Sequence, residues 1–134
     1  ENVVAIKEAT GEVSRLAALL PSGLRCFSGD DASSLAFVQA GGHGVVSVAS
    51  NVEPLLMSQM VAAALQGSAE ALAFNDTLMP LYSALFVETN PIPVKWLLAK
   101  RGLIQSGIRL PLTPLSPKGQ ENLNTCLADL KMVL

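Results

Sequence analysis

A lysine follows the first apolar run of the chain. Lys7 comes directly after Val-Val-Ala-Ile at residues 3–6, and an unbroken run of this kind is typical of a strand buried on both faces. A lysine at the carboxyl end of a barrel strand points into the mouth of the barrel, where partial desolvation favours the neutral amine. A neutral amine attacks a ketone to form an imine, so Lys7 is a candidate Schiff-base nucleophile. Two plainer interpretations stay open: a lysine whose stem covers apolar surface, or one paired with Glu8.

A second group of candidate residues follows the next β-type run. Ser28-Gly29-Asp30-Asp31 comes directly after it. A small residue such as Gly29 lets the backbone approach a ligand, and the two acids can cap the helix that follows. Capping alone would account for both acids. The glycine-rich run around His43 precedes a strand instead of opening a helix, which is the wrong end for anion binding, so we interpret His43 as a turn residue.

The other reactive side chains form no known constellation. The single histidine and the two widely separated cysteines, Cys26 and Cys126, have no metal-ligand spacing. Both cysteines lie in apolar patterns typical of free, buried thiols, and no spacing supports a Ser–His–acid triad. We therefore expect no disulfide and no metal site.

The elements that must position these residues alternate between strands and helices. The expected strands span residues 3–6, 24–27 and 45–48. A helical pattern follows each of them, the last one opening at Pro54 and ending at Gly67. Three consecutive βα units require a parallel sheet with covering helices, which is an α/β fold. Three strands cannot close a barrel, which needs eight, so the sequence predicts roughly half of a larger (β/α) protein.

After Gly67 the β-type runs stop and an all-helical segment begins. We expect helices over residues 68–86, with a kink or break at Pro80, over residues 94–100, and from Pro117 onward with Ser116 as its cap. The last helix carries Leu123, Leu127 and Leu130 on one face. Trp96 is expected to be a packing anchor. This segment would serve as a scaffold, since the chemistry of a barrel needs none of it.

Composition excludes several classes of protein. Half of the 134 residues are hydrophobic, 15% are charged and the mean hydropathy is +0.42, which excludes a disordered tail. The net charge of -2 argues against nucleic acid as the main partner. The longest uncharged stretch, residues 32–52, is rich in Gly and Ser and is not a membrane-spanning helix. No signal-peptide pattern opens the chain, so we expect a cytoplasmic protein without membrane contact.

Four segments resemble the dihydrodipicolinate synthase family. They are residues 3–11, 28–31, 42–48 and 85–95, in the order in which that family has them. The strand lysine is shared with the wider class of pyruvate-dependent aldolases, which includes N-acetylneuraminate lyase. The run Asn90-Pro-Ile-Pro-Val-Lys95 is more specific to the synthase. The resemblance covers essentially the whole chain.

The resemblance implies a TIM (β/α)8 barrel followed by a helical C-terminal domain. Residues 1–66 would be the last three βα units of the barrel, and residues 67–134 the α-helical C-terminal domain. Lys7 would form the Schiff base with pyruvate, Gly29 would line the substrate pocket, and Val46 would lie beside bound pyruvate. The family's Thr-Thr-Gly-Glu motif, its relay tyrosines and the arginine for the second substrate would belong to the missing N-terminal half.

The resemblance also implies the reaction and the assembly. The full enzyme is a lyase of lysine biosynthesis that condenses pyruvate with aspartate 4-semialdehyde, needs no metal or cofactor, and is a homotetramer. We expect this chain to be inactive without the N-terminal half of the barrel. Two alternatives remain open: a sister pyruvate-dependent aldolase similar to N-acetylneuraminate lyase, and a non-catalytic fragment that assembles with a companion chain.

Overall fold

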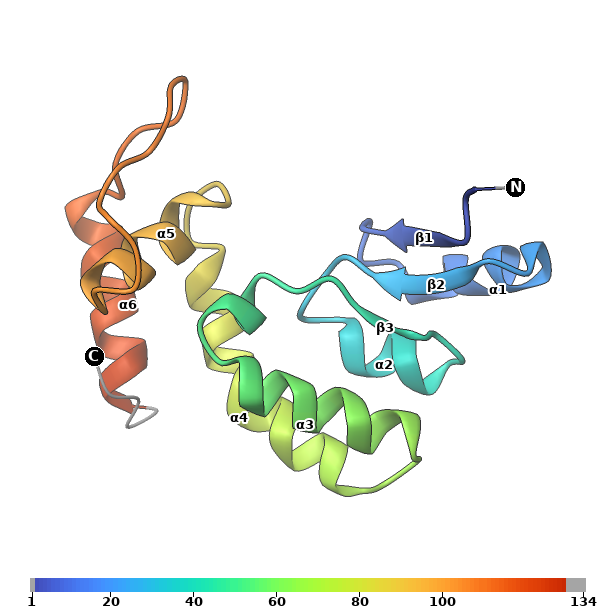
Figure 1. The fold of residues 1–134 in the computed structure, drawn as a ribbon. Helices are drawn as coiled ribbons and strands as arrows, with labels where there is room; N and C mark the ends of the chain where they lie inside the picture. The colour runs from blue at the N-terminus through green and yellow to red at the C-terminus, as the bar shows by residue number, and fades with distance from the viewer. Residues whose placement is uncertain (1, 130–134) are drawn as a thin grey trace.

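The chain forms a small parallel sheet at one end and a group of helices at the other (Figure 1). The computed structural model describes residues 2–129. The sheet contains β1 (Ala5–Glu8), β2 (Arg25–Ser28) and β3 (Gly44–Val45), in the order β1-β2-β3. Both strand pairs are parallel. The predicted α/β fold is therefore confirmed.

Helices connect the strands and then continue beyond them. Short helical turns, η1 (Val13–Arg15), α1 (Leu16–Leu19) and η2 (Leu20–Ser22), join β1 to β2, and α2 (Ser34–Gln39) joins β2 to β3. The remaining elements are η3 (Ala49–Asn51), α3 (Pro54–Leu65), α4 (Glu70–Leu85), α5 (Ile92–Lys100) and α6 (Pro117–Asp129). No helix within residues 2–129 is long and apolar enough to cross a membrane.

The first strand lies two residues later than predicted. It spans Ala5–Glu8 instead of residues 3–6, and Val3 and Val4 are 73% and 70% exposed. The carbonyl of Val4 still accepts a hydrogen bond from the amide of Arg25 at 3.1 Å, so the backbone lies beside the start of β2 while the side chains of residues 3 and 4 are exposed within the described part of the chain. Burial on both faces was therefore the wrong prediction for residues 3 and 4. The second strand is shifted by one residue relative to residues 24–27.

The third strand is much shorter than the predicted residues 45–48. Only Gly44–Val45 pairs with β2. Beyond the amide of Val46, which donates to the carbonyl of Ser28 at 2.7 Å, the backbone leaves the sheet. The amides of Val48 and Ala49 donate instead to the carboxylate of Asp31, at 3.0 and 2.8 Å. The carboxylate of Asp31 therefore accepts the hydrogen bonds of these amides, and they form no further ladder with β2.

The long helices follow the predicted pattern with one correction. Helix α4 runs through Pro80 without a break, so of the predicted kink or break, the break is wrong. Pro80 itself is exposed, whereas its neighbours Leu78 and Leu81 are fully buried, and their packing supports the helix across the missing backbone hydrogen bond. At the start of α6, the Ser116 hydroxyl accepts a hydrogen bond from the amide of Gly119 at 3.1 Å, as the predicted cap requires. Leu130 lies outside the described residues.

One hydrophobic core connects the sheet side of the molecule to the last helix. It runs from Leu35 on α2 through Met60 on α3 and Leu81 on α4 to Leu97 on α5 and Leu123 on α6. Helices α3 and α4 lie side by side along its length (Figure 1). A smaller cluster of Leu16, Cys26 and Phe37 lies under the sheet. The helices that follow residue 67 therefore share a core with the βα units.

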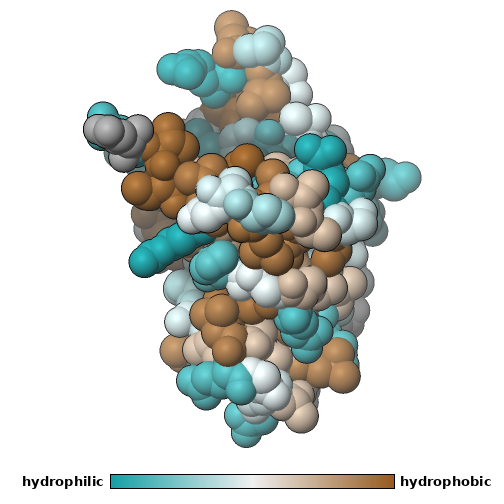
Figure 2. Space-filling model, turned by 90° about the vertical axis from the view of Figure 1, so that its right-hand side faces the viewer, coloured by the Kyte–Doolittle hydropathy of each residue, from teal (hydrophilic) through white to brown (hydrophobic). Residues whose placement is uncertain are grey.

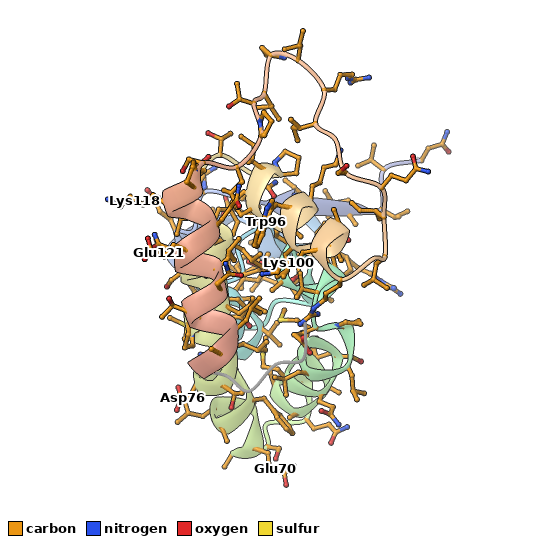
Figure 3. All side chains as sticks on the ribbon, turned by 90° about the vertical axis from the view of Figure 1, so that its left-hand side faces the viewer. Glu70, Asp76, Trp96, Lys100, Lys118 and Glu121 are labelled. Carbon is orange, nitrogen blue, oxygen red and sulfur yellow. The ribbon has the colours of Figure 1, made fainter. Side chains whose placement is uncertain are left out.

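Trp96 packs at the edge of this core. Its side chain is only partly buried, whereas its neighbour Leu97 is completely buried. The Lys100 ammonium lies 5.0 Å from the centre of the indole ring, within the range of a cation–π interaction, and also donates to the side-chain amide of Asn124 on α6. Figure 3 shows Trp96 and Lys100 on the same helix beside α6. Leu97 is thus the residue that anchors α5 in the core, and the half-buried Trp96 beside it packs against the core edge and contacts Lys100.

Candidate active site

Strand alternation separates Lys7 from Glu8. Lys7 is exposed, whereas the next residue, Glu8, is buried at 7% exposure, because successive side chains of a strand point to opposite faces. The Glu8 carboxylate accepts hydrogen bonds from the hydroxyl and amide of Thr10, and forms an ion pair with Arg15 at 3.0 Å. The alternative interpretation, in which Lys7 pairs with Glu8, is therefore wrong.

The partners of Glu8 favour its charged form. Burial alone would raise the pKa of the Glu8 carboxyl, but the hydrogen bonds from Thr10 and the nearby Arg15 guanidinium outweigh that effect and hold the pKa below its ordinary value of 4.5. The ionised Glu8 thus fixes the loop that follows β1 and leaves the amine of Lys7 on the other face of the strand.

Gly29 lies against the side chain of Lys7. It follows β2 directly, and its amide donates to the carbonyl of Glu8 at 2.6 Å. A Cβ atom at Gly29 would lie 2.5 Å from Cε of Lys7 and 2.7 Å from Cβ of Ala9. Contacts this short do not occur between real atoms, so a side chain at position 29 would push the exposed, flexible stem of Lys7 aside and strain the backbone that carries Ala9. The structure therefore brings Lys7 and Gly29 together.

Val46 and Lys7 line one pocket of about 280 Å³. Val46 follows β3 and is 50% exposed. The pocket continues along Ser47 and Val48, and its opposite wall comes from Asn90, Val94 and Lys95. The residues at the start of α5 thus face the strand lysine. Gly29 is not part of the pocket wall; it touches the stem of Lys7 from the side.

Asp31 has a role that the sequence did not indicate. Neither acid caps α2, because its N-cap residue is Ser33 and no side-chain hydrogen bond caps the helix. The carboxylate of the neighbouring Asp30 accepts hydrogen bonds from the amide and hydroxyl of Ser33, at 2.9 and 2.6 Å, in the turn before α2. The Asp31 side chain is 1% exposed and binds the amides of Val48 and Ala49 instead. Those partners are 17 and 18 residues away, and no local spacing rule could have identified them.

A larger hollow next to β3 lacks the residues for chemistry. It measures about 420 Å³ and lies between β3 and α3, with Phe27, Val45, Met57 and Val61 among its walls. His43 also borders it, but Nδ1 of His43 accepts a hydrogen bond from the amide of Cys26 at 3.1 Å, in agreement with a structural role. Within residues 2–129, no three His, Cys, Asp or Glu side chains gather as a metal site.

These features define a class of protein: a parallel α/β protein with its candidate site where the carboxyl ends of the strands meet the start of a later helix. The comparison with known families is more specific. The model of the dihydrodipicolinate synthetase family matches residues 1–130, and the chain belongs to this family.

Curated synthases match this chain over nearly its whole length. The 4-hydroxy-tetrahydrodipicolinate synthase of Thiobacillus denitrificans is 50% identical over 135 residues, which cover 98% of this chain and 46% of the relative. The Pseudomonas aeruginosa synthase is 48% identical over 130 residues, covering 94% of this chain and 44% of the relative. This chain thus spans about half the length of the curated relatives it matches.

Solved structures of the same family have the same fold over this region. The crystal structure of the chloride-inhibited dihydrodipicolinate synthase from Acinetobacter baumannii, complexed with pyruvate, matches with a TM-score of 0.92 at 40% identity, covering 98% of this chain and 47% of that protein. The Aquifex aeolicus dihydrodipicolinate synthase matches with a TM-score of 0.94 at 36% identity, covering 99% of this chain and 47% of that protein.

The lowered pKa of Glu8 predicts an acid-dependent stability. Because folding lowers this pKa, ionised Glu8 stabilises the fold above its ordinary value of 4.5, and this contribution is lost as the pH falls through the folded-state pKa. We expect Glu8→Gln to unfold at a lower temperature than the original chain at neutral pH, and the difference to shrink below pH 4.5. Thermal unfolding of both proteins over a pH series measures this. A difference that stays constant across the series would contradict this prediction. Thr10→Val removes one hydrogen bond that lowers the pKa of Glu8, so it should move the acid transition to higher pH.

Proposed function

We propose that this chain is the C-terminal half of a dihydrodipicolinate synthase. In this proposal residues 1–66 are the last three βα units of a (β/α)8 barrel, residues 67–134 are its helical domain, and Lys7 is the lysine that forms a Schiff base with pyruvate. The observation that carries the proposal is the meeting of Lys7, Gly29 and the Asn90–Lys95 segment, because three separate parts of the sequence that resemble the family converge on one lysine.

The charge of the pocket supports an anionic substrate. Lys7 and Lys95 are the ionisable residues among those that line it, and both are basic. Ser47, Asn51 and Asn90 add polar groups to the same walls. An α-keto acid such as pyruvate carries one carboxylate next to the ketone that an amine attacks, so it suits a cationic pocket that contains an amine nucleophile.

The proposed reaction needs one covalent intermediate on Lys7. The neutral Nζ of Lys7 attacks the ketone carbon of pyruvate, and the resulting carbinolamine takes up one proton at its hydroxyl and loses water, which leaves a protonated imine. This cation withdraws electrons, so a methyl proton of the bound pyruvate leaves and an enamine forms. The enamine carbon then bonds to the aldehyde carbon of aspartate 4-semialdehyde. The amino group of that substrate displaces Lys7 from the imine carbon, which closes the ring of 4-hydroxy-tetrahydrodipicolinate and frees the lysine.

Each local residue contributes a physical function to these steps. Gly29 leaves room for the stem of Lys7, because any side chain there would occupy the position of its Cε. Val46 supplies an apolar surface in the same pocket, which excludes water from the imine. The groups that move protons and bind the second substrate belong, in this proposal, to the other half of the barrel.

The surface of the chain leaves room for such a half. Within residues 2–129 the outer edges of β1 and β3 have no strand beside them, and unpaired edges of this kind bind further strands. Exposed apolar side chains include Val3, Val4, Val46 and Leu55. The face on the sheet side of the molecule shows several separate areas of hydrophobic surface (Figure 2). We propose that the N-terminal half of the barrel covers these edges.

The proposal does not depend on a homotetramer. The resemblance implies that assembly, but one similar structure is described as the first monomeric dihydrodipicolinate synthase variant; its TM-score is 0.91 at 40% identity.

We expect Lys7 to be the residue that traps pyruvate. The test uses this chain joined behind the N-terminal half of the Thiobacillus denitrificans synthase, which we call the completed barrel. Incubation with pyruvate and borohydride, followed by peptide mapping, should place the reduced adduct on the Lys7 peptide. Lys7→Arg keeps the charge but cannot form the imine, so it should abolish labelling and lower kcat by at least about a hundredfold.

Lys95→Arg is the matched control, since Lys95 lines the same pocket. It should keep the adduct on Lys7. An adduct that persists in Lys7→Arg, or one that maps to Lys95, would refute the assignment.

We expect Gly29→Ala to impair imine formation by moving Lys7. The added methyl group would meet both Lys7 and Ala9, so the rate of borohydride trapping in the completed barrel should fall by about tenfold or more. The double variant Gly29→Ala with Ala9→Gly removes the contact with Ala9 and keeps the contact with Lys7. Recovery of trapping in the double variant would show that Ala9, and not Lys7, limits the substitution.

A further inference from the structure

The loop that carries Val46 is attached to the sheet at two points. At its start, the amide of Val46 donates to the carbonyl of Ser28 at 2.7 Å, as in a normal sheet ladder. At its end, the amides of Val48 and Ala49 both donate to Oδ2 of Asp31, at 3.0 and 2.8 Å. Between these points lie residues 46–48, which form one wall of the pocket that contains Lys7.

The carboxylate of Asp31 is buried where it makes these bonds. Asp31 is 1% exposed, and its Oδ1 atom has no hydrogen-bond partner within the described part of the chain. Burying a carboxylate is costly unless several donors surround it. The two loop amides are the hydrogen-bond donors to this carboxylate within residues 2–129, so the side chain and the loop hold each other in place.

A role as a helix cap does not explain this side chain. Asp31 does contact the start of α2, but through its main-chain carbonyl, which accepts hydrogen bonds from the hydroxyl and amide of Ser34 at 2.7 and 3.2 Å. The side chain points the other way, to the loop. Asp30 next to it shows the opposite arrangement, with its carboxylate bonded to Ser33.

The tyrosine nearest to this network acts as packing. Tyr82 is 2% exposed, and its hydroxyl donates to the sulfur of Met57 at 3.1 Å. Burial, and then the negative charge of Asp31, raise the pKa of the Tyr82 hydroxyl, so Tyr82 stays neutral beside the carboxylate. The hydrogen bonds to the Asp31 carboxylate within residues 2–129 are therefore those of the two loop amides.

We propose that Asp31 is a positioning residue for pyruvate binding. By holding Val48 and Ala49, it sets the place of the 46–48 wall relative to Lys7, and so the fit of the pocket around the ketone. This inference rests on the proposed function, because it assigns the pocket to pyruvate. The attachment of the loop itself does not rest on it and can be measured separately.

Three variants of the completed barrel test the role. Asp31→Ala removes both acceptor contacts, so KM for pyruvate should rise by about tenfold, while kcat should stay within about threefold because Lys7 is untouched. Asp31→Asn keeps an oxygen that can accept from both amides and should restore KM to within about threefold. Asp30→Ala is the matched control, since it breaks the turn before α2 without touching the loop, and it should leave KM unchanged.

Amide hydrogen exchange of the unsubstituted protein provides a test that needs no variant. The amides of Val48 and Ala49 should be protected, as should that of Val46. In Asp31→Ala, Val48 and Ala49 should lose protection while Val46 keeps it. If Asp31→Ala does not fold, exposed Val48 and Ala49 amides in the unsubstituted protein would still overturn the proposal.

The outcomes separate the two proposals. An unchanged KM in Asp31→Ala, or an equal rise in Asp30→Ala, would overturn the positioning role while leaving Lys7 as the Schiff-base residue. Failure of the unsubstituted completed barrel to trap pyruvate would refute the proposed function, and the exchange data would then still show whether Asp31 holds the loop.

Discussion

The candidate site depends on the close approach of the Lys7 stem to the backbone of Gly29. The parallel register places Lys7 beside Phe27 and Glu8 beside Ser28, so the residue that follows β2 comes next to the side chain of Lys7. An ideal Cβ at position 29 would lie 2.5 Å from Lys7 Cε, so a side chain there would displace the stem of Lys7 from its present position. Register, strand length and the choice of glycine must therefore agree for the lysine to lie where it does.

The helical half of the chain takes part in the same site. Helix α5 contributes Val94, Lys95 and Leu98 to the pocket of Lys7, and the core fixes that helix through Leu97. The guanidinium of Arg101 donates to the carbonyl of Val52 at 2.8 Å and pairs with Glu53 at 3.0 Å. The end of α5 is thus tied to the segment before α3. The helices that were expected to act as a scaffold therefore also line the candidate pocket.

Local patterns predicted the elements better than their edges and contacts. The βα alternation, the helix after Pro54 and the Ser116 cap follow from short-range preferences, and all are present. The strand ends were wrong because they depend on tertiary contacts: the side chains of residues 3 and 4 are exposed within the described part of the chain, and Asp31 binds the amide of Val48, the last residue of the predicted third strand. Two tertiary contacts could not be predicted from local sequence patterns. Asp31 binds a loop that is distant in the sequence, and Lys95 lines the pocket that contains Lys7.

The most direct test of the account is a crystal structure of the completed barrel soaked with pyruvate. The account predicts continuous electron density from Nζ of Lys7 to the ketone carbon of pyruvate, next to Val46, with further parallel strands paired to the outer edges of β1 and β3. Pyruvate bound covalently to another lysine, or strands β1 and β3 left open at their outer edges, would contradict it.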